Sequence, residues 1–390
     1  MITEKLFYID TYMKEFEAVV LGCEAKDDKF LIELDRTCFY PEGGGQNADI
    51  GTIDTAHVFD VHEKDGAILH YADIPLEVGS KVTGKIDWLR RYSLMQHHSG
   101  EHVVSGIVNK LHGLDNVGFH MGDSVMIVDF NGRLSAEDVK KIELAANKAV
   151  YTNADITVSY PSVEELETMR FRSKIELTED LRIVSIGEDI DCCACCAPHV
   201  MKTGEVGIIK VLDFYSYKQG TRIEMVAGIH ALMDYMDLNV RSKEVMKLLS
   251  APRDGIAEAV REKNTSYQNL YNEYQKNVKK LALYELALVE VGASVYAVAE
   301  GLSFDELRYC ANQLMDRDYS VCMLFSENNG TEYGYVVSSK EKDIRGFAGK
   351  LNESFAGKGG GQPGYVQGKI NVSDKANLKA FVEEILKNEI

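Results

Sequence analysis

The most constraining feature of this 390-residue chain is a pair of short motifs that lie far apart but share one spacing. His98 and His102 are four residues apart, and so are Cys195 and His199. The first pair lies in a pattern that predicts a helix over residues 87–111, where this spacing puts both imidazoles on one face. Nitrogen and thiolate donors suit a borderline-soft ion such as zinc. Either pair alone is a weak signal, but together they predict one zinc site.

Several runs resemble one known family. Residues 95–102 (MQHHSGEH) resemble the HxxxH signature of the alanyl-tRNA synthetase editing domain and of its freestanding AlaX-type relatives, and residues 195–199 resemble their CxxxH. Residues 35–46, ending in FYPEGGGQ, resemble their FYPxGGGQ loop. TGEVG at 203–207 is a fourth match, and GKGGGQPG at 357–364 resembles the glycine-rich signature of the DHHA1 domain. The order is the family order, so the chain resembles the long AlaX type over nearly its whole length.

The cysteine motif departs from the family pattern. Where the family has Gly-Gly-Thr, this chain has Cys196, Ala197 and Pro198, and the proline removes one backbone donor. Further thiols at Cys192 and Cys193 make the region rich in cysteine. Several thiols are therefore candidates for the liganding sulfur, and the spacing from His199 favours Cys195.

The resemblance implies a zinc-dependent deacylase that hydrolyses tRNA(Ala) mischarged with serine or glycine. Thr37 in the matched loop is then expected to read the serine hydroxyl, and Gln46 to contact substrate through its amide. Glu101 and Asp191 are candidates for supporting the ligands or orienting water, although each could equally be an exposed residue with no role. Gly43, Gly44 and Gly45 are expected to bind substrate, and the alternative is a tight turn at positive φ.

Two other functions stay open at this point. One is a tRNA-binding or interaction protein with a structural zinc and no hydrolytic activity, since four protein ligands usually mark a structural site. The other is a zinc hydrolase of another small ester, with the terminal glycine-rich domain binding a nucleotide.

Composition bears on compartment and partners. The start of the chain lacks a basic stretch followed by an apolar core, and no run reaches the length of a membrane span, which predicts a cytoplasmic protein. The eight cysteines fit metal binding or free thiols better than a disulfide framework.

A net charge of −18 argues against broad nucleic-acid binding, but residues 340–369 carry six cations against three acids. We expect Lys358, Gly359, Gly360 and Gly361 in this stretch to contact tRNA, although a solvated loop is the alternative.

Hydrophobic periodicity predicts an α+β fold in four parts. Residues 1–86 read as a β-barrel-like module, and 87–228 as an α+β editing core with the zinc site. Residues 229–290 read as a helical linker with a coiled-coil seam that includes Val260, with a second helix starting at Ser250. That seam fits either a plain packing helix or a dimer coil. A homodimer could form through this linker or through the last domain. Residues 291–390 read as a DHHA1-like α/β domain.

Overall fold

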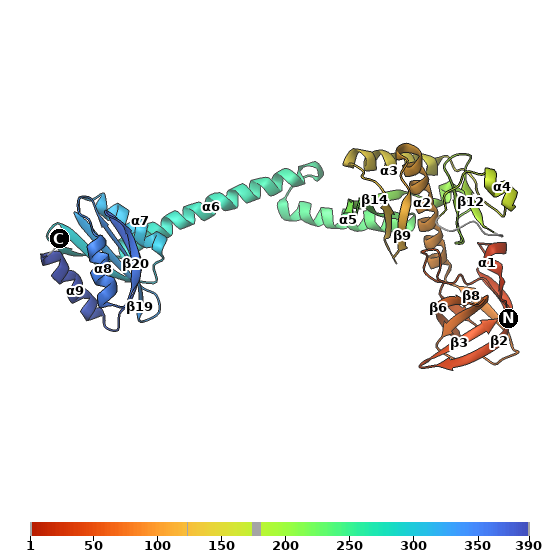
Figure 1. Cartoon of the computed structure of the whole chain (residues 1–390), viewed down its shortest axis with the longest axis horizontal. Helices are drawn as coiled ribbons and strands as arrows, with labels where there is room; N and C mark the ends of the chain where they lie inside the picture. The colour runs from red at the N-terminus through yellow and green to blue at the C-terminus, as the bar shows by residue number, and fades with distance from the viewer. Residues whose placement is uncertain (1, 123, 174–180, 389–390) are drawn as a thin grey trace. The chain divides into compact units, whose positions relative to one another are not determined.

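The computed structural model describes residues 2–122, 124–173 and 181–388 (Figure 1). It divides into two compact units, Met1–Glu244 and Val245–Ile390. The predicted α+β class is confirmed, while the finer four-part division stays a prediction. In the part of the chain that the structure covers, no helix is both long and apolar enough to cross a membrane.

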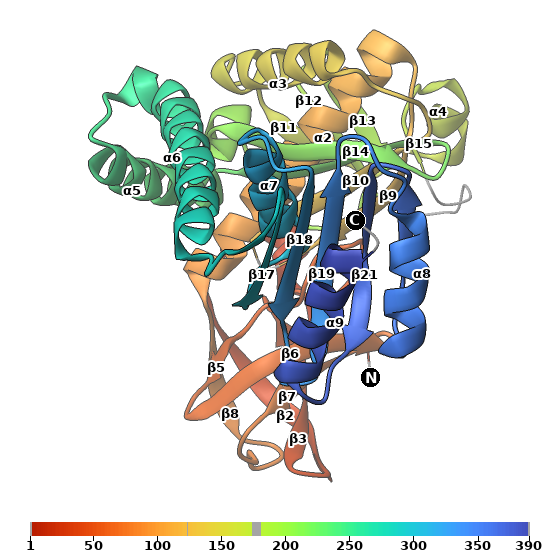
Figure 2. The same cartoon turned by 90° about the vertical axis from the view of Figure 1, so that its left-hand side faces the viewer.

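The first unit begins with a closed antiparallel barrel, as the alternating pattern predicted (Figure 2). Val20, Ile32 and Ile68 belong to its buried core, while their neighbours along each strand are more exposed. That alternation follows from the two-residue period of a strand. Around the barrel the strands run in the order β2 (Glu15–Lys26), β3 (Lys29–Leu34), β7 (Ala67–Ala72), β6 (Ala56–Lys64), β5 (Gly51–Ile53) and β8 (Lys81–Ile86).

The predicted zinc helix is α2, Trp88–His112. Asp87 caps it by accepting a hydrogen bond from the Arg90 backbone N–H, and Gly113 ends it in the left-handed conformation, both as predicted. The helix has no solvent-facing side over this stretch, because every side chain from Ser93 to Val108 is buried. The helix is thus a central element of the first unit.

Two larger sheets, a short strand pair and further helical segments also belong to the first unit. The four-stranded sheet β14-β15-β10-β9 packs with α2 and α3 around one hydrophobic core, and a three-stranded sheet β11-β12-β13 carries the cysteine run. The predicted cap of α3, Ser135, forms a capping box with Asp138. The elements are β9 (Asn116–Met121), β10 (Met126–Phe130), α3 (Ala136–Tyr151), β11 (Ile156–Ser159), α4 (Val163–Thr168), β12 (Ile183–Ile186), β13 (Asp191–Ala194), η1 (Thr203–Val206), β14 (Ile209–Tyr217) and β15 (Gly220–Ala227). Two short elements, β1 (Glu4–Lys5) and α1 (Leu6–Ile9), precede the first barrel strand in sequence. Strand β1 pairs in parallel with β4 (Arg36–Thr37), which follows β3.

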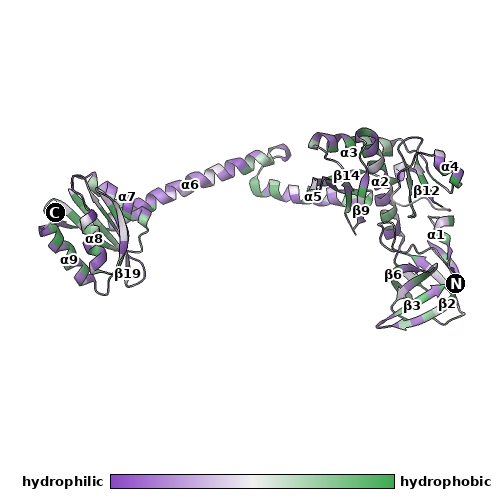
Figure 3. Cartoon of the chain, viewed as in Figure 1, coloured by the Kyte–Doolittle hydropathy of each residue, from purple (hydrophilic) through white to green (hydrophobic). Residues whose placement is uncertain are grey.

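Two long helices follow, α5 (Ile229–Leu249) and α6 (Ile256–Glu285). The second does not start at Ser250: that residue has φ +52° and follows the end of α5, and a 3-10 turn, η2 (Arg253–Gly255), precedes α6. Figure 3 shows mostly hydrophilic residues along α6. The large apolar side chains of the predicted seam are exposed there, Val260 at 41% and Tyr267 at 68%. Homodimerisation through them stays a prediction.

The second unit ends in a six-stranded sheet with helices on both faces. Alternate strand residues such as Met323 and Tyr335 pack under α8 and α9, and those of opposite parity such as Leu324 and Val336 pack under α7 and the end of α6. The sheet order is β16-β17-β18-β19-β21-β20, which puts β20 at an edge. The elements are β16 (Val289–Val291), β17 (Ser294–Glu300), α7 (Phe304–Met315), β18 (Val321–Glu327), β19 (Glu332–Ser339), α8 (Arg345–Ser354), β20 (Lys358–Gln362), β21 (Tyr365–Asn371) and α9 (Lys375–Asn388).

Candidate metal centre

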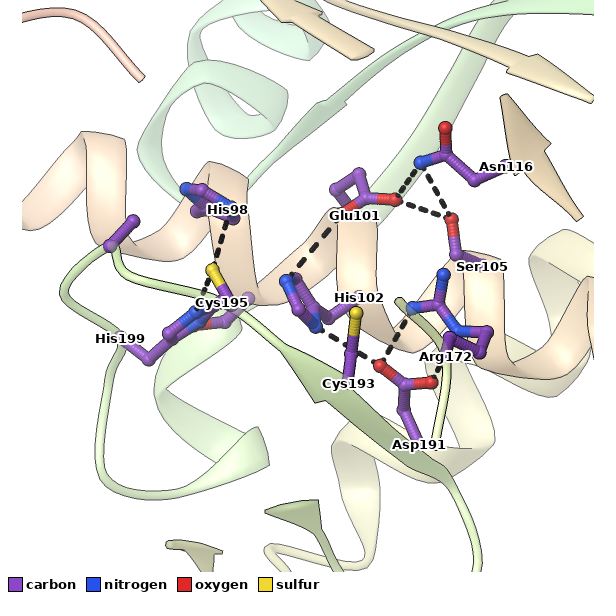
Figure 4. Close-up of polar contacts among 12 residues, drawn as sticks. His98, Glu101, His102, Ser105, Asn116, Arg172, Asp191, Cys193, Cys195 and His199 are labelled. Atoms are coloured by element: carbon purple, nitrogen blue, oxygen red, sulfur yellow. Dashed lines mark hydrogen bonds and ion pairs between the residues drawn. The ribbon is translucent and has the colours of Figure 1, made fainter. Parts of the chain in front are cut away.

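The structure brings the four predicted ligands together (Figure 4). One donor atom from each of His98, His102, Cys195 and His199 lies within 4.8 Å of the others, and all four side chains are wholly or largely buried. Cys195 Sγ is 3.5 Å from His98 Nε2 and 3.4 Å from His199 Nε2. In a tetrahedral zinc site the nitrogen and sulfur ligands are roughly 3.5 Å apart. The cluster therefore has the spacing that zinc requires.

Each imidazole is held from behind through Nδ1, which leaves Nε2 for a metal. His98 Nδ1 lies 3.0 Å from Gln46 Oε1, and His102 Nδ1 lies 3.0 Å from Asp191 Oδ2. His199 Nδ1 lies 3.0 Å from the hydroxyl of Ser99. An amide or carboxylate oxygen only accepts hydrogen bonds, so the first two rings carry their proton on Nδ1. Such outer partners are typical of histidine ligands in metal sites.

The charges in the cluster favour a thiolate. Burial raises the pKa of the Cys195 thiol, but the three nearby imidazoles lower it more, and the net pKa is well below its ordinary value. Burial lowers the pKa of His102. The negative Cys195 sulfur and the hydrogen bond to Asp191 raise it by more, so the net pKa is well above its usual range. Burial dominates at His199 and lowers its pKa to about 3. A thiolate is the form of cysteine that binds zinc, and His102 would release its extra proton when it binds the metal.

Asp191 is fixed by a second cation as well as by His102. Arg172 donates from Nε to Asp191 Oδ1 at 2.7 Å and from Nη2 to Oδ2 at 2.8 Å. Burial raises the pKa of Asp191, but the bonds from His102 and Arg172 lower it more, so the carboxylate stays charged. His102, Asp191 and Cys193 also approach one another closely enough to suggest a second metal group. Because Arg172 engages both oxygens of Asp191, we interpret this carboxylate as a support for His102.

The cluster lies in the wall of a large cavity of about 1560 Å³. His98, His102 and Cys195 line it, together with Glu101 and the glycine loop. Glu101 is 3% exposed, and its Oε1 accepts hydrogen bonds from the Ser105 hydroxyl and, at 2.5 Å, from Asn116 Nδ2 (Figure 4). Its Oε2 lies 3.8 Å from His102 Nε2. A fixed carboxylate thus faces the metal-binding side of the cluster.

The glycine loop forms a tight turn against the same site. Gly43 and Gln46 bond each other's backbones at 3.1 and 3.0 Å, and Gly44 and Gly45 both have positive φ, as the turn interpretation predicted. A Cβ at Gly44 would lie 3.2 Å from Cys196 Sγ, and one at Gly45 only 2.7 Å from the Phe119 ring. Glycine is therefore required both for conformation and for close approach. Gly44 and Gly45 line the cavity, and their contact with substrate stays a prediction.

Arg182 holds the loop between Cys195 and His199. Its Nη1 donates to the carbonyls of Cys195 at 2.7 Å and Ala197 at 2.9 Å. These contacts fix the cysteine loop in which Pro198 replaces the usual residue. Pro198 and the extra thiols leave the cluster geometry intact, and Cys195 is the sulfur at its centre.

Thr37 is not brought to this cavity. Its side chain is fully buried in the barrel, where its hydroxyl lies 2.9 Å from His70 Nε2 and accepts from the Phe39 backbone N–H at 3.1 Å. His70 Nδ1 in turn lies 3.0 Å from the Ile32 carbonyl, so it carries the ring proton and the Thr37 hydroxyl donates to Nε2.

Thr37→Val should therefore act on stability. The substitution keeps the shape but leaves His70 Nε2 without a donor, which is expected to cost about 1–3 kcal/mol of unfolding free energy. Denaturant titration measures this, and deacylation of seryl- and alanyl-tRNA measures selectivity. An unchanged stability with a reduced serine preference would show that the hydroxyl meets substrate instead.

The terminal glycines form a strand and not a flexible loop. Lys358–Gln362 is the exposed edge strand β20, paired with β21. A Cβ at Gly359 would lie only 2.3 Å from the Tyr335 hydroxyl. The strands can therefore pair this closely because residue 359 is a glycine. The local excess of cations is also partly neutralised. Lys340 pairs with Asp318, Arg345 with Asp343 and Lys369 with Glu332.

Sequence reasoning missed Ser99, Ser105, Asn116, Arg172 and Arg182. Ser99 lies between the two histidine ligands in sequence, and that position was its only signal. Ser105 lies four residues after Glu101 in the predicted helix, a spacing that puts both on one face. Asn116, Arg172 and Arg182 come from segments without a motif, so nothing in the sequence marked them. The TGEVG motif at 203–207 serves packing, because its Glu205 accepts hydrogen bonds from the hydroxyls of Tyr12 at 2.6 Å and Tyr92 at 3.2 Å.

Family models match three segments of the chain. Residues 6–90 match "tRNA synthetases class II (A)", 181–224 match "Threonyl and Alanyl tRNA synthetase second additional domain", and 291–388 match the "DHHA1 domain". The second of these contains Cys195 and His199, and the third contains β20.

The similarity to two known proteins extends over nearly the whole chain. The alanyl-tRNA editing protein AlaX-L of Pyrococcus horikoshii is 28% identical over 98% of both chains. An alanine–tRNA ligase of Methanobrevibacter smithii is 30% identical over 97% of this chain, which spans 44% of that ligase. The solved C-Ala domain of Aquifex aeolicus alanyl-tRNA synthetase is 23% identical, covering 26% of this chain and all of that one, with a TM-score of 0.24.

Proposed function

Because this chain belongs to the long AlaX family of alanyl-tRNA editing proteins, we propose that it hydrolyses the ester of tRNA(Ala) mischarged with serine or glycine. One observation carries the proposal: His98, His102 and His199 turn Nε2 toward the Cys195 thiolate in the wall of an open cavity. The donor set and its spacing fit zinc. Bound there, zinc would polarise the ester carbonyl and lower the pKa of an attacking water.

The chain's own residues prepare this site. Gln46 and Asp191 orient His98 and His102, and we assign them positioning roles. Gln46 Nε2 is buried without a hydrogen-bond partner in the described part of the chain, which suits a donor to the bound ester. Gly44 and Gly45 let the substrate approach the cluster. Hydrolysis then adds water to the carbonyl carbon, and the ribose hydroxyl leaves with a proton.

A deacylation assay tests the function directly. Purified protein is incubated with tRNA(Ala) charged separately with serine, glycine and alanine, and release is measured with and without chelator. Rapid release of serine or glycine but not alanine is expected. A chain that binds all three and hydrolyses none contradicts the proposal.

A tRNA-binding protein with a structural zinc is the second candidate, because four protein ligands usually fill a closed shell. Zinc removal separates the two. A structural site loses its fold together with the metal, whereas loss of activity with the fold retained, followed by circular dichroism, supports hydrolysis.

The terminal strand is proposed to bind the tRNA backbone. Lys358 and Gly359–Gly361 lie on the exposed edge β20, and Lys358→Ala should raise KM for charged tRNA with little change in kcat. The slope of log affinity against log salt should fall by about one unit. Lys369→Ala is the matched control, because Lys369 is paired with Glu332 at 2.9 Å. Equal effects of the two substitutions would argue against a specific contact by Lys358.

A further inference from the structure

Glu101 turns its carboxylate oxygen Oε2 toward the metal-binding side of the cavity. Its Oε1 is held by Ser105 and Asn116, and Asn116 is itself fixed because its Oδ1 accepts from the Gly118 backbone N–H at 3.0 Å. Oε2 lies 3.8 Å from His102 Nε2, the nitrogen that faces the cluster. The side chain is 3% exposed and lines the cavity. A negative charge is thus held rigidly beside the place where an ester carbonyl would lie.

We propose that Glu101 Oε2 binds the α-ammonium group of the esterified amino acid, which restricts the site to esters whose α-amino group is free. This inference rests on the proposed deacylase function and names its substrate class.

The covalent geometry of an aminoacyl ester fits this position. The α-nitrogen is two bonds from the carbonyl carbon, which places it roughly 2.5 Å away. A carbonyl bound at the cluster therefore puts its ammonium within a few ångströms of His102 Nε2. The carboxylate of Glu101 lies at that range, and an ammonium–carboxylate contact is among the stronger hydrogen bonds.

Charge balance supports the same assignment. A divalent ion held by one thiolate and three neutral imidazoles leaves a net positive charge, which repels a cationic ester. Glu101 lies next to this cluster, whereas Asp191 behind it is already bound on both oxygens by Arg172. An ester that lacks the ammonium cannot form this charged hydrogen bond with Glu101, and such bonds are about twice as strong as neutral ones. The site therefore rejects N-acylated and α-hydroxy esters.

Binding of stable analogues tests the proposal without catalysis. The ligands are 3′-deoxy-3′-(L-serylamino)adenosine, whose amide resists hydrolysis, and its counterpart with a hydroxyl in place of the α-amino group. By calorimetry on the zinc-loaded chain, the amino ligand is expected to bind about 10- to 100-fold more tightly, as for a hydrogen bond between charged groups. Glu101→Gln should remove this preference while zinc content stays unchanged. Glu188→Gln, which neutralises an exposed carboxylate of the same cavity, should keep it.

Hydrolysis distinguishes this role from that of a base. Seryl-tRNA(Ala) is compared with the same tRNA after nitrous acid has converted the α-amino group to a hydroxyl, each rate divided by its spontaneous rate. We expect the wild type to prefer the amino ester and Glu101→Gln to lose that preference. If Glu101→Gln slows both esters equally, Glu101 activates water and the proposal is wrong.

The wild-type comparison stands even if Glu101→Gln does not fold. Equal affinity and equal hydrolysis of the two esters by the wild type overturn this inference and leave the deacylase function intact. No hydrolysis of any aminoacyl-tRNA(Ala) overturns the deacylase function, and this inference with it.

Discussion

Cys195→Ala is expected to remove the bound zinc and to abolish deacylation. Cys195 Sγ is the atom that His98 and His199 both approach at about 3.5 Å, so its loss takes away one of four donors and the only negative one. Loss of an outer partner already costs about 10- to 100-fold in metal affinity, and loss of a direct ligand should exceed this range. Elemental analysis and release of serine from seryl-tRNA(Ala) measure the two effects.

Cys193→Ala provides the matched control. Cys193 is in the same cysteine run and approaches His102 and Asp191, but it lies outside the four-residue cluster. Burial raises the pKa of its thiol to about 11, so it is protonated at neutral pH and is a poor ligand. This variant should keep about one zinc per chain. Zinc lost from Cys193→Ala and retained in Cys195→Ala would show that the wrong sulfur has been assigned.

Arg91→Ala is expected to destabilise the first unit by about 3–5 kcal/mol, the usual result of leaving one partner of a buried ion pair alone. Arg91 and Asp49 are 0% and 1% exposed. Arg91 Nε donates to Asp49 at 2.9 Å and Nη2 donates to the Cys38 carbonyl at 2.6 Å. Asp49 also accepts from the Tyr40 backbone N–H. The pair joins α2 to the segment that carries the glycine loop, so zinc affinity should fall as well.

Hydrogen exchange measures the loss separately in the two units. Amides of α2 should exchange faster in Arg91→Ala, while those of the sheet in Val245–Ile390 serve as the internal control. Replacing both partners, as in Arg91→Met with Asp49→Leu, should recover part of the stability because no charge is left buried. An Arg91→Ala protein whose α2 amides are protected to within about 1 kcal/mol of wild type would contradict this account.

Sequence patterns predicted the elements whose signals are local. The α2 caps Asp87 and Gly113 follow from residue type and position, and the barrel strands follow from alternation. The ligand set followed from two equal spacings. For His98 and His102 the spacing is about one helical turn, whereas Cys195 and His199 lie in a loop. In each case the physical cause acts over a few residues, so it can be read from the chain itself.

Contacts between distant segments had no such signal. The structure places Thr37 on His70 inside the barrel, although its motif predicted a role at the substrate. Arg172 meets Asp191 through a pairing that no periodicity marks. The glycine run at Lys358–Gln362 resembles a loop by composition, and only its packing on Tyr335 makes it a strand. Tertiary packing decides such positions, and composition alone does not.

The long separation between the two ligand pairs has a consequence during synthesis. Cys195 lies 97 residues after His98, and a ribosome adds about 5–20 residues per second. For roughly 5 to 20 seconds the nascent chain therefore exposes two histidines without the thiolate that completes the set. The barrel residues precede both pairs, so this module can fold first and present Gln46 while the ribosome is still at work. Metal capture by the full ligand set must then follow synthesis of His199, and a chain interrupted before Cys195 carries only half a site.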